Sequence, residues 1–419
     1  MATTLSTPRE ILADSNAATT AAQPVEPETR TGRIASIDIL RGAVMVLMAI
    51  DHVRVYAGVA PGGPTPGLFF TRWVTHFCAP AFVFLAGTAA YLHGRRLGSA
   101  KALRRYLVTR GLWLILLELT VIRLAWTFNV DFANYLLAGV IWAIGWSMIF
   151  LAALVKLPRV LTGAIGVALL AGHNGWAASL GDGAQQLAEG AAGWFWRILY
   201  FGGVVNVGGD GGPPLIVLYT LIPWIGVMAA GYAFGMIVSF DAPRRARWCY
   251  AIGIGATLLF VVLRWFEVYG DWPWRGQMAE GMPAALAFLN TSKYPASFLF
   301  LLMTLGPTIA LVPVLESARG RLAQWLTVFG RVPMFYYLLH IPLIHAAAVG
   351  VAALRTPQHL GWLFENHPMG MSPPPDGYAW SLGLLYLVTI AVVVVLYFPC
   401  RWYMRLKQER RDEKWLSYL

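Results

Sequence analysis

Residues 33–58 read RIASIDILRGAVMVLMAIDHVRVYAG. The stretch is mostly apolar and exceeds the length of about 20 residues that a membrane-spanning helix needs. It nevertheless carries ionisable side chains, among them Asp38, Arg41, Asp51 and His52. Charge at membrane depth is costly and by default marks function. We therefore predict that this first helix crosses a membrane and that it carries functional residues.

The composition extends that prediction to the whole chain. Of its 419 residues, 58% are hydrophobic and 13% are charged, whereas a soluble domain carries about 25% charged residues. The shortfall excludes a soluble enzyme, a disordered chain and an ordinary nucleic-acid binder. The net charge of +11 then indicates basic loops on the cytoplasmic side of a membrane rather than a nucleic-acid partner. The three cysteines form no CxxC motif, so neither a disulfide framework nor a structural zinc site is supported.

Ten apolar runs are candidates for membrane spans. The ninth is long and interrupted by Pro333 and Pro342, so it is expected to kink or to re-enter the membrane. We predict an all-α, polytopic integral membrane protein with about ten transmembrane helices, one of them broken or re-entrant. The ten runs cover residues 36–57, 73–93, 104–122, 135–155, 159–176, 214–239, 248–268, 294–315, 322–353 and 379–400.

Lysine and arginine residues are spread unevenly over the segments between these runs. With the N-terminus inside, 22 of the 32 Lys and Arg residues fall on the cytoplasmic side and 8 on the outer side, as the positive-inside rule requires. Both termini should then be cytoplasmic, in a multi-pass protein of the cell's inner (plasma) membrane. The predicted parts are a disordered cytoplasmic tail at 1–32, a transmembrane domain at 33–402 and a basic cytoplasmic tail at 403–419.

The spacing of the ionisable residues on the first helix predicts a division of labour. Arg41 and His52 share one helix face and lie about 16.5 Å apart along the axis, with Arg41 nearer the cytoplasm. A guanidinium there suits the phosphates of a cytosolic donor, and a neutral imidazole suits a general base. Asp38 can pair with Arg41, and Asp51 can tune or orient a neighbouring imidazole. In the alternative interpretation, Asp38 and Arg41 form a structural pair and His52 hydrogen-bonds at the outer interface.

Other segments supply further candidates. His76 lies at a depth comparable with His52 and either faces it or is a satisfied interface residue. Lys293, at the outer face, either binds an anionic or carbonyl group or snorkels. Asn290 either hydrogen-bonds a sugar or polyol acceptor or caps a helix. Arg331 is embedded in the ninth run and needs an acidic, phosphate or backbone partner. No spacing of ligands supports a metal site.

At this point the pattern resembles a known family. R-x4-D-x2-R-G at Arg33–Gly42, followed by an apolar helix that ends in Asp51 and His52, resembles the bacterial membrane proteins grouped with the lysosomal heparan-alpha-glucosaminide N-acetyltransferase. The spacing Arg41-x10-His52 is also similar to the arginine–histidine motif of the acyltransferase-3 membrane family. The resemblance is dispersed over about residues 33–400 and includes the segments THFCAPAFVFLAG, YTLIPWIGVMAAGYAFG, NTSKYPASFLFLLMTLGP and FGRVPMFYYLLHIPLIH.

The resemblance implies that 33–402 is a transmembrane acyltransferase-like domain. It would move an acyl group, most simply acetyl, from cytosolic acetyl-CoA to a carbohydrate hydroxyl or amine across the membrane, without a metal. His52 would be the catalytic histidine and Arg41 would help to hold acyl-CoA. In the lysosomal enzyme the catalytic histidine follows the first helix. The alternatives to His52 are therefore that His76 is the catalytic histidine or that the activity has been lost. The implied partners are membrane lipid, acyl-CoA and a glycan acceptor; a homodimer is compatible, and no nucleic acid is expected.

The competing interpretation is a non-covalent transporter or lipid-handling protein. The buried His, Asp and Arg side chains would then form a proton relay or an anion site. The broken ninth segment favours this interpretation, and the lack of an internal sequence repeat counts against it. Release of free thiol in the presence of an acceptor distinguishes the two, because a transporter need not cleave a thioester.

Overall fold

A computed structural model describes residues 34–63, 65–368, 371–410, 413 and 416 of the chain. The tail predicted at 1–32, and part of the tail predicted at 403–419, lie outside the described residues. From Ala35 onward the chain forms a single unit. That unit is built mainly of helices, with three short strands described.

Helices occupy each of the ten predicted spans. The exceptions to a simple apolar span are α1 (Ala35–Tyr56) and α4 (Ala100–Leu117), which carry more charge, and α6 (Val140–Leu154), which is shorter. The prediction of an all-α polytopic membrane protein is therefore confirmed. Seven described spans are long and apolar enough to cross a membrane: α2 (Pro66–Trp73) continued through η1 (Val74–Phe77) into α3 (Cys78–Leu97), α7 (Arg159–Leu180), α10 (Leu221–Val238), α11 (Ala242–Phe266), α14 (Phe298–Glu316), α16 (Pro333–Arg355) and α17 (Leu382–Glu409).

Two predicted spans begin too early, because each opens with a strand. The run at 214–239 starts as β3 (Pro214–Val217), and the run at 135–155 starts as β1 (Leu136–Ala138). β3 pairs in parallel with β1 and antiparallel with β2 (Gly203–Asn206). Each prediction joined a strand and the following helix into one span, because hydropathy does not distinguish a short buried strand from a buried helix.

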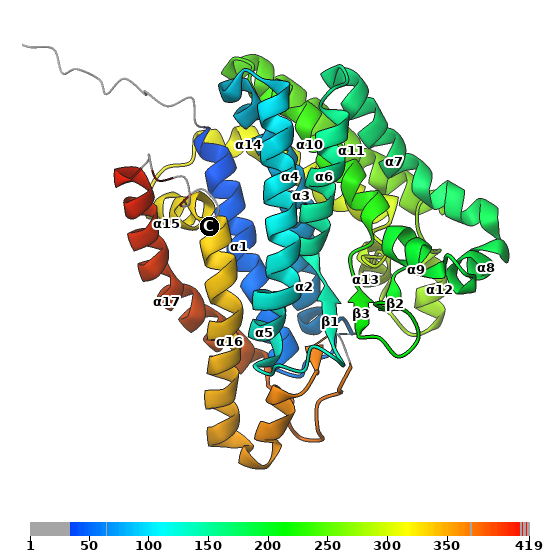
Figure 1. Cartoon of the computed structure of the whole chain (residues 1–419), viewed down its shortest axis with the longest axis vertical. Coiled ribbons are helices and arrows are strands. Elements are labelled where there is room, and N and C mark those ends of the chain that lie inside the picture. The colour runs from blue at the N-terminus through cyan, green and yellow to red at the C-terminus, as the bar shows by residue number, and fades with distance from the viewer. Residues whose placement is uncertain (1–33, 64, 369–370, 411–412, 414–415, 417–419) are drawn as a thin grey trace, which may run out of the picture. The chain divides into compact units, whose positions relative to one another are not determined.

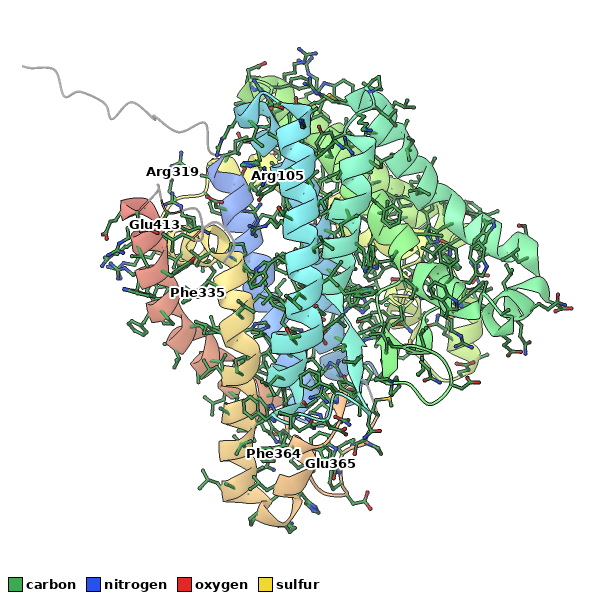
Figure 2. The ribbon with its side chains drawn as sticks, in the orientation of Figure 1. Arg105, Arg319, Phe335, Phe364, Glu365 and Glu413 are labelled. Atoms are coloured by element: carbon green, nitrogen blue, oxygen red, sulfur yellow. The ribbon has the colours of Figure 1, made fainter. Side chains whose placement is uncertain are left out.

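Short helices fill the segments between the spans. They are η2 (Glu118–Ile122) and α5 (Arg123–Thr127) after α4, then α8 (Gly183–Glu189), α9 (Gly193–Trp196), η3 (Arg197–Phe201), α12 (Trp274–Ala279), α13 (Ala284–Leu289) and η4 (Pro357–Phe364). Figure 1 shows α8, α9, α12 and α13 gathered on one side, away from α16 and α17. Figure 2 shows Arg105 and Arg319, from predicted cytoplasmic segments, toward one end, and Phe364 and Glu365, from a predicted outer loop, at the opposite end.

The first helix lies inside the bundle rather than on its surface. It packs against α3, α14, α16 and α17, and also against α15 (Arg321–Arg331). Figure 1 shows α1, in blue, running beside α16. The ionisable side chains of α1 therefore meet other helices and not only lipid, which lowers the cost of placing them there.

The ninth predicted span is broken, as expected, but at one of its two prolines. α15 ends at Arg331, and Val332, with φ −131° and ψ 49°, separates it from α16. Pro333 is the first residue of α16, where its missing N–H costs no helical hydrogen bond. Pro342 lies inside α16 without ending it.

Two glycines bring the backbones of α1 and α15 into direct contact. A Cβ placed on Gly42 would lie 1.8 Å from the carbonyl oxygen of Leu326, and one placed on Gly330 would lie 1.8 Å from the carbonyl oxygen of Asp38. Small residues allow such close approach between membrane helices. The contact holds the ends of α1 and α15 together beside Asp38.

We expect Gly330→Ala to destabilise the protein by about 1–3 kcal/mol or more, because the added methyl group overlaps the backbone of α1. Gly350→Ala is the matched control, since a Cβ on Gly350 of α16 meets nothing within 4 Å. The control should leave stability unchanged or raise it, because alanine favours a helix over glycine. Thermal unfolding of both variants in detergent measures the difference, and equal midpoints would contradict the close contact.

Candidate functional site

The first site residues lie where α1 meets α15. The Asp38 carboxylate is 3.7 Å from Arg41 Nη1 and 3.7 Å from Arg331 Nε. Arg41 Nη1 also donates a hydrogen bond to the carbonyl oxygen of Gly330 at 3.5 Å. The Asp38 side chain is 5% exposed, whereas those of Arg41 and Arg331 are 17% and 34% exposed. We call Asp38, Arg41 and Arg331 the arginine cluster.

The arginine cluster brings together the three residues predicted to hold the donor. Arg331 finds the acidic partner that its position required, and Asp38 forms the predicted pair with Arg41. Because two guanidinium groups share one carboxylate, the cluster keeps a net positive charge. Partly exposed guanidinium groups of this kind suit phosphate, which they bind through paired N–H donors.

The second group lies farther along α1, where His52 meets His340 of α16. His52 Nδ1 and His340 Nε2 are 2.7 Å apart. The ring planes differ by 25° and the ring centroids are 4.8 Å apart, so the two imidazoles meet edge to edge, as a hydrogen bond between ring nitrogens requires. We call His52 and His340 the histidine pair.

When His52 and His340 are both neutral, the contacts of His340 determine which nitrogen of each imidazole carries the proton. His340 Nδ1 lies 2.7 Å from the carbonyl oxygen of Tyr337. A carbonyl only accepts, so His340 carries its proton on Nδ1 and Nε2 is an acceptor. His52 must then donate from Nδ1, which leaves its Nε2 with a lone pair. Among the described residues no hydrogen bond engages that nitrogen, and a nitrogen with these properties can act as a base.

Aromatic rings surround the histidine pair. Trp126 of α5 meets His52 edge to face with centroids 4.8 Å apart, and Tyr336 lies nearly parallel to His340 at 5.3 Å. His340 is fully buried, whereas His52 keeps partial exposure. Surroundings of low polarity strengthen the hydrogen bonds that hold the rings. His340 is thus enclosed, and His52 is the more exposed member of the pair.

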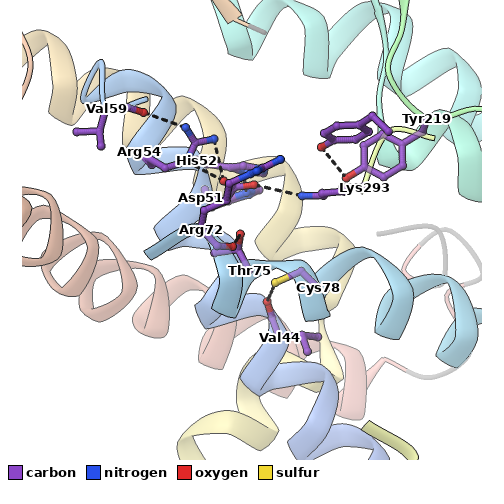
Figure 3. Close-up of polar contacts among 12 residues, drawn as sticks. Val44, Asp51, His52, Arg54, Val59, Arg72, Thr75, Cys78, Tyr219 and Lys293 are labelled. Carbon is purple, nitrogen blue, oxygen red and sulfur yellow. Dashed lines mark hydrogen bonds and ion pairs between the residues drawn. The ribbon is translucent and has the colours of Figure 1, made fainter. Parts of the chain in front are cut away.

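Asp51 pairs with cations and makes no hydrogen bond to His52 among the described contacts. Arg54 Nη2 lies 3.0 Å and Lys293 Nζ 3.6 Å from the Asp51 carboxylate, as Figure 3 shows. Lys293 is 6% exposed, so it does not snorkel to water. Burial opposes its charge, but Tyr294 and Asp51 together raise the pKa of Lys293 above its usual value.

Polar contacts with Asp271 and Arg264 position the segment that carries Asn290 and Lys293. The Asp271 carboxylate accepts hydrogen bonds from the Ser292 backbone and hydroxyl at 2.9 and 2.8 Å and from the Ser297 hydroxyl at 2.8 Å. Arg264 donates to the Asn290 carbonyl oxygen at 2.6 Å. The segment that carries Lys293 toward Asp51 is therefore fixed from both sides.

Comparison with known proteins relates this geometry to a family. The sequence profile of the catalytic region of heparan-alpha-glucosaminide N-acetyltransferase matches residues 33–265, which is more than half of the chain. The chain belongs to the heparan-alpha-glucosaminide N-acetyltransferase family. No curated protein matches its sequence. The family implies a membrane N-acetyltransferase, which lies within the predicted reaction class.

The match to the heparan-alpha-glucosaminide N-acetyltransferase profile covers only part of the candidate site. It contains α1, with Arg41 and His52, and ends within α11. His340, Arg331 and Lys293 lie beyond the matched residues and reach the site through the fold. The arginine cluster and the histidine pair are each built from one matched and one unmatched segment.

Among the described residues, His76 makes no hydrogen bond and no ring contact with either member of the histidine pair. His76 is 2% exposed, and neither ring nitrogen has a hydrogen-bond partner among the described residues. Its ring meets Phe300 edge to face at 5.4 Å and lines a small cavity with Arg72 and Asn290. Of the two predicted candidates for the catalytic histidine, His52 has an imidazole partner and His76 has none.

His340 is the site residue that the sequence did not identify. The segment FYYLLHIPLIH contains His340 and His345, and their spacing argued only against a shared metal. The available signal was a histidine in an apolar helix just after a break, which marks a site in many membrane proteins. In the described part of the chain, no group of three His, Cys, Asp or Glu side chains is arranged to hold a metal ion.

Proposed function

We propose that the protein is a transmembrane acyltransferase that moves an acyl group, most simply acetyl, from cytosolic acyl-CoA to a hydroxyl or amine of a carbohydrate across the membrane. The histidine pair carries this proposal, because His340 holds one nitrogen of His52 and leaves the other as a base. The family supports acetyl transfer within a membrane.

The reaction needs one base that becomes an acid. The acceptor hydroxyl or amine attacks the thioester carbonyl while His52 Nε2 takes its proton. The carbon–sulfur bond then breaks, and the His52 imidazolium returns the proton to the departing thiolate, so free thiol and acylated acceptor leave. His340 Nε2 accepts from His52 Nδ1 throughout and stabilises the imidazolium. An acyl-histidine formed at the same Nε2 is the alternative route.

The donor would lie along α1. Arg41 and Arg331 would bind the phosphates of CoA at the arginine cluster, with Asp38 orienting both guanidinium groups. Eleven residues separate Arg41 from His52, which is about 16.5 Å along the helix axis. A donor with a phosphate head and a long flexible arm fits that separation and presents its thioester to His52.

We expect Arg41→Ala to weaken acetyl-CoA binding about 10–100-fold, because a hydrogen bond to a charged group contributes about 1.5–3 kcal/mol. Turnover at saturating acetyl-CoA should change little. Arg319→Ala is the control, since exposed Arg319 donates, within the described part of the chain, only to the carbonyl oxygens of Glu316 and Ala318. Equilibrium binding to protein in detergent measures the effect; equal losses of binding in Arg41→Ala and His52→Ala would refute the division of labour.

The decisive experiment follows thiol release from acetyl-CoA by purified protein with a panel of amino sugars and polyols. Saturable, acceptor-dependent release supports the acyltransferase. The transporter or lipid-handling function is the second candidate, favoured by the break at Val332. It predicts movement of an anionic solute or lipid across a liposome membrane without release of thiol.

The same proposal fixes an orientation. With both termini in the cytoplasm, the arginine cluster faces cytosolic acyl-CoA and Lys293 faces the acceptor side of an inner (plasma) membrane. The distribution of Lys and Arg supports this orientation. Protease accessibility of a C-terminal tag in inside-out and right-side-out vesicles tests it.

A further inference from the structure

A small cavity lies beside the proposed acceptor side of the site. Its volume is about 80 Å³, and it is lined by Gly62, Arg72, Trp73, His76 and Asn290 among others. A water molecule needs about 10–15 Å³ of such volume, so the cavity has room for several waters or for one compact polar group. We call it the Arg72 cavity.

The lining of the Arg72 cavity is rich in unpartnered hydrogen-bonding groups. His76, although 2% exposed, has no hydrogen-bond partner at either ring nitrogen, and Trp73 Nε1 has none within the described chain. Buried polar groups are normally satisfied, so these groups point to a ligand or to water. None of the described lining residues is acidic, and the cavity therefore presents a cation and donors without a carboxylate.

Arg72 differs from Arg264 of α11 and Arg123 of α5, whose guanidinium groups are held by backbone carbonyls. Arg264 donates to four backbone carbonyls, and Arg123 likewise bonds backbone carbonyls, including that of Tyr135. The Arg72 guanidinium makes no such bond and no ion pair with the described residues, although it lies against Gly62. A guanidinium left with its donors free in a cleft suits a bidentate anion.

The surrounding charges favour an anion rather than repel it. Asp51 is the acidic group within electrostatic reach of both Arg72 and His76, and Figure 3 shows it close to Arg72. Its carboxylate is already paired with Arg54 and Lys293. The local balance around the cavity is thus positive.

We propose that the Arg72 cavity binds an acidic group, a carboxylate or a phosphate or sulfate ester, carried by the acceptor. This inference rests on the proposed function, because it takes the neighbouring histidine pair to be the reaction centre. Arg72 would hold the acidic group through two parallel N–H donors, with His76 and Trp73 Nε1 as further donors. The cavity would thereby select an acidic carbohydrate over its neutral counterpart.

Equilibrium binding of radiolabelled sugars to the purified full chain in detergent tests the inference. The probes are two matched pairs, galacturonate with galactose and glucose 6-phosphate with glucose. We expect saturable binding of at least one acidic sugar, at least tenfold weaker binding of its neutral partner, and a loss of at least tenfold in Arg72→Gln. The acidic sugar that binds identifies the acidic group as carboxylate or phosphate.

Two control variants show whether a loss of binding comes from the Arg72 guanidinium or from a general effect of removing an arginine. Arg355→Gln removes an exposed arginine at the end of α16 and should bind like the wild type. Arg72→Lys, which keeps the charge without the bidentate geometry, should bind between wild type and Arg72→Gln. Equal binding of acidic and neutral sugars, no binding of either acid, or an unchanged Arg72→Gln would overturn the inference.

The same assay distinguishes this inference from the proposed function. Acid binding that persists in His52→Gln, without thiol release by any protein, would leave the Arg72 cavity as an anion site and refute the acyltransferase. Thiol release with neutral sugars, without binding of acidic ones, would keep the acyltransferase and refute the cavity.

Discussion

Replacing His52 with glutamine is expected to slow acyl transfer about 10²–10⁴-fold, because general acid–base catalysis contributes that much. Glutamine can still donate a hydrogen bond to His340 Nε2, but it has no nitrogen lone pair that can take up a proton. The affinity for acetyl-CoA should stay unchanged, since the donor phosphates are assigned to the arginine cluster. Thiol release at saturating acceptor gives kcat, and equilibrium binding gives the dissociation constant of acetyl-CoA.

A matched control removes a buried histidine elsewhere. His173 of α7 is 4% exposed and lies 3.3 Å from the Tyr200 hydroxyl, so His173→Gln tests the loss of any buried imidazole. It should turn over like the wild type. A normal kcat in His52→Gln, together with a lost kcat in His76→Gln, would transfer the catalytic role to His76 and refute our assignment.

The fold was largely predictable because a membrane imposes a strong and local signal. About 20 apolar residues in succession mark a span, and the first run, predicted at 36–57, forms α1 at Ala35–Tyr56. The break before Pro333 was predictable because proline disfavours a helical conformation of the residue before it, here Val332, whereas Pro342 lies inside α16 without ending it. The strand β3 was not predictable, because its pairing with β1 joins residues far apart in sequence.

In the candidate site, too, contacts within one helix were predictable and contacts between distant segments were not. Asp38 and Arg41 are three residues apart on one helix, so their pairing follows from helix geometry. His52 and His340 are 288 residues apart, and no periodicity within either helix relates them. Asp51 likewise turned out to face Lys293 of a distant loop rather than the imidazole next to it.

Substitution of His340 tests the role of the hydrogen-bond partner of His52 while His52 itself stays unchanged. We expect His340→Phe to lower kcat about 10²–10⁴-fold, because loss of an acceptor that fixes the tautomer of a catalytic histidine is known to cost as much as about 10⁴-fold. Phenylalanine preserves an aromatic ring beside Tyr336 but cannot accept from His52 Nδ1. His52 is then free to carry its proton on Nε2, where it no longer acts as a base. Thiol release measures kcat and KM for the acceptor.

A conservative variant separates this positioning role from packing. The side-chain oxygen of glutamine can accept from His52 Nδ1, so His340→Gln should retain much of the turnover that His340→Phe loses, with KM and acetyl-CoA affinity close to wild type in both. A role in packing alone predicts the reverse order, since the aromatic ring fills the site better than the amide. Because the Tyr337 carbonyl orients His340 and His340 orients His52, the nitrogen proposed as the base would be set by a backbone group two hydrogen bonds away. Loss of turnover in His52→Gln with normal turnover in both His340 variants would leave His52 as the base but remove this chain of hydrogen bonds from the mechanism.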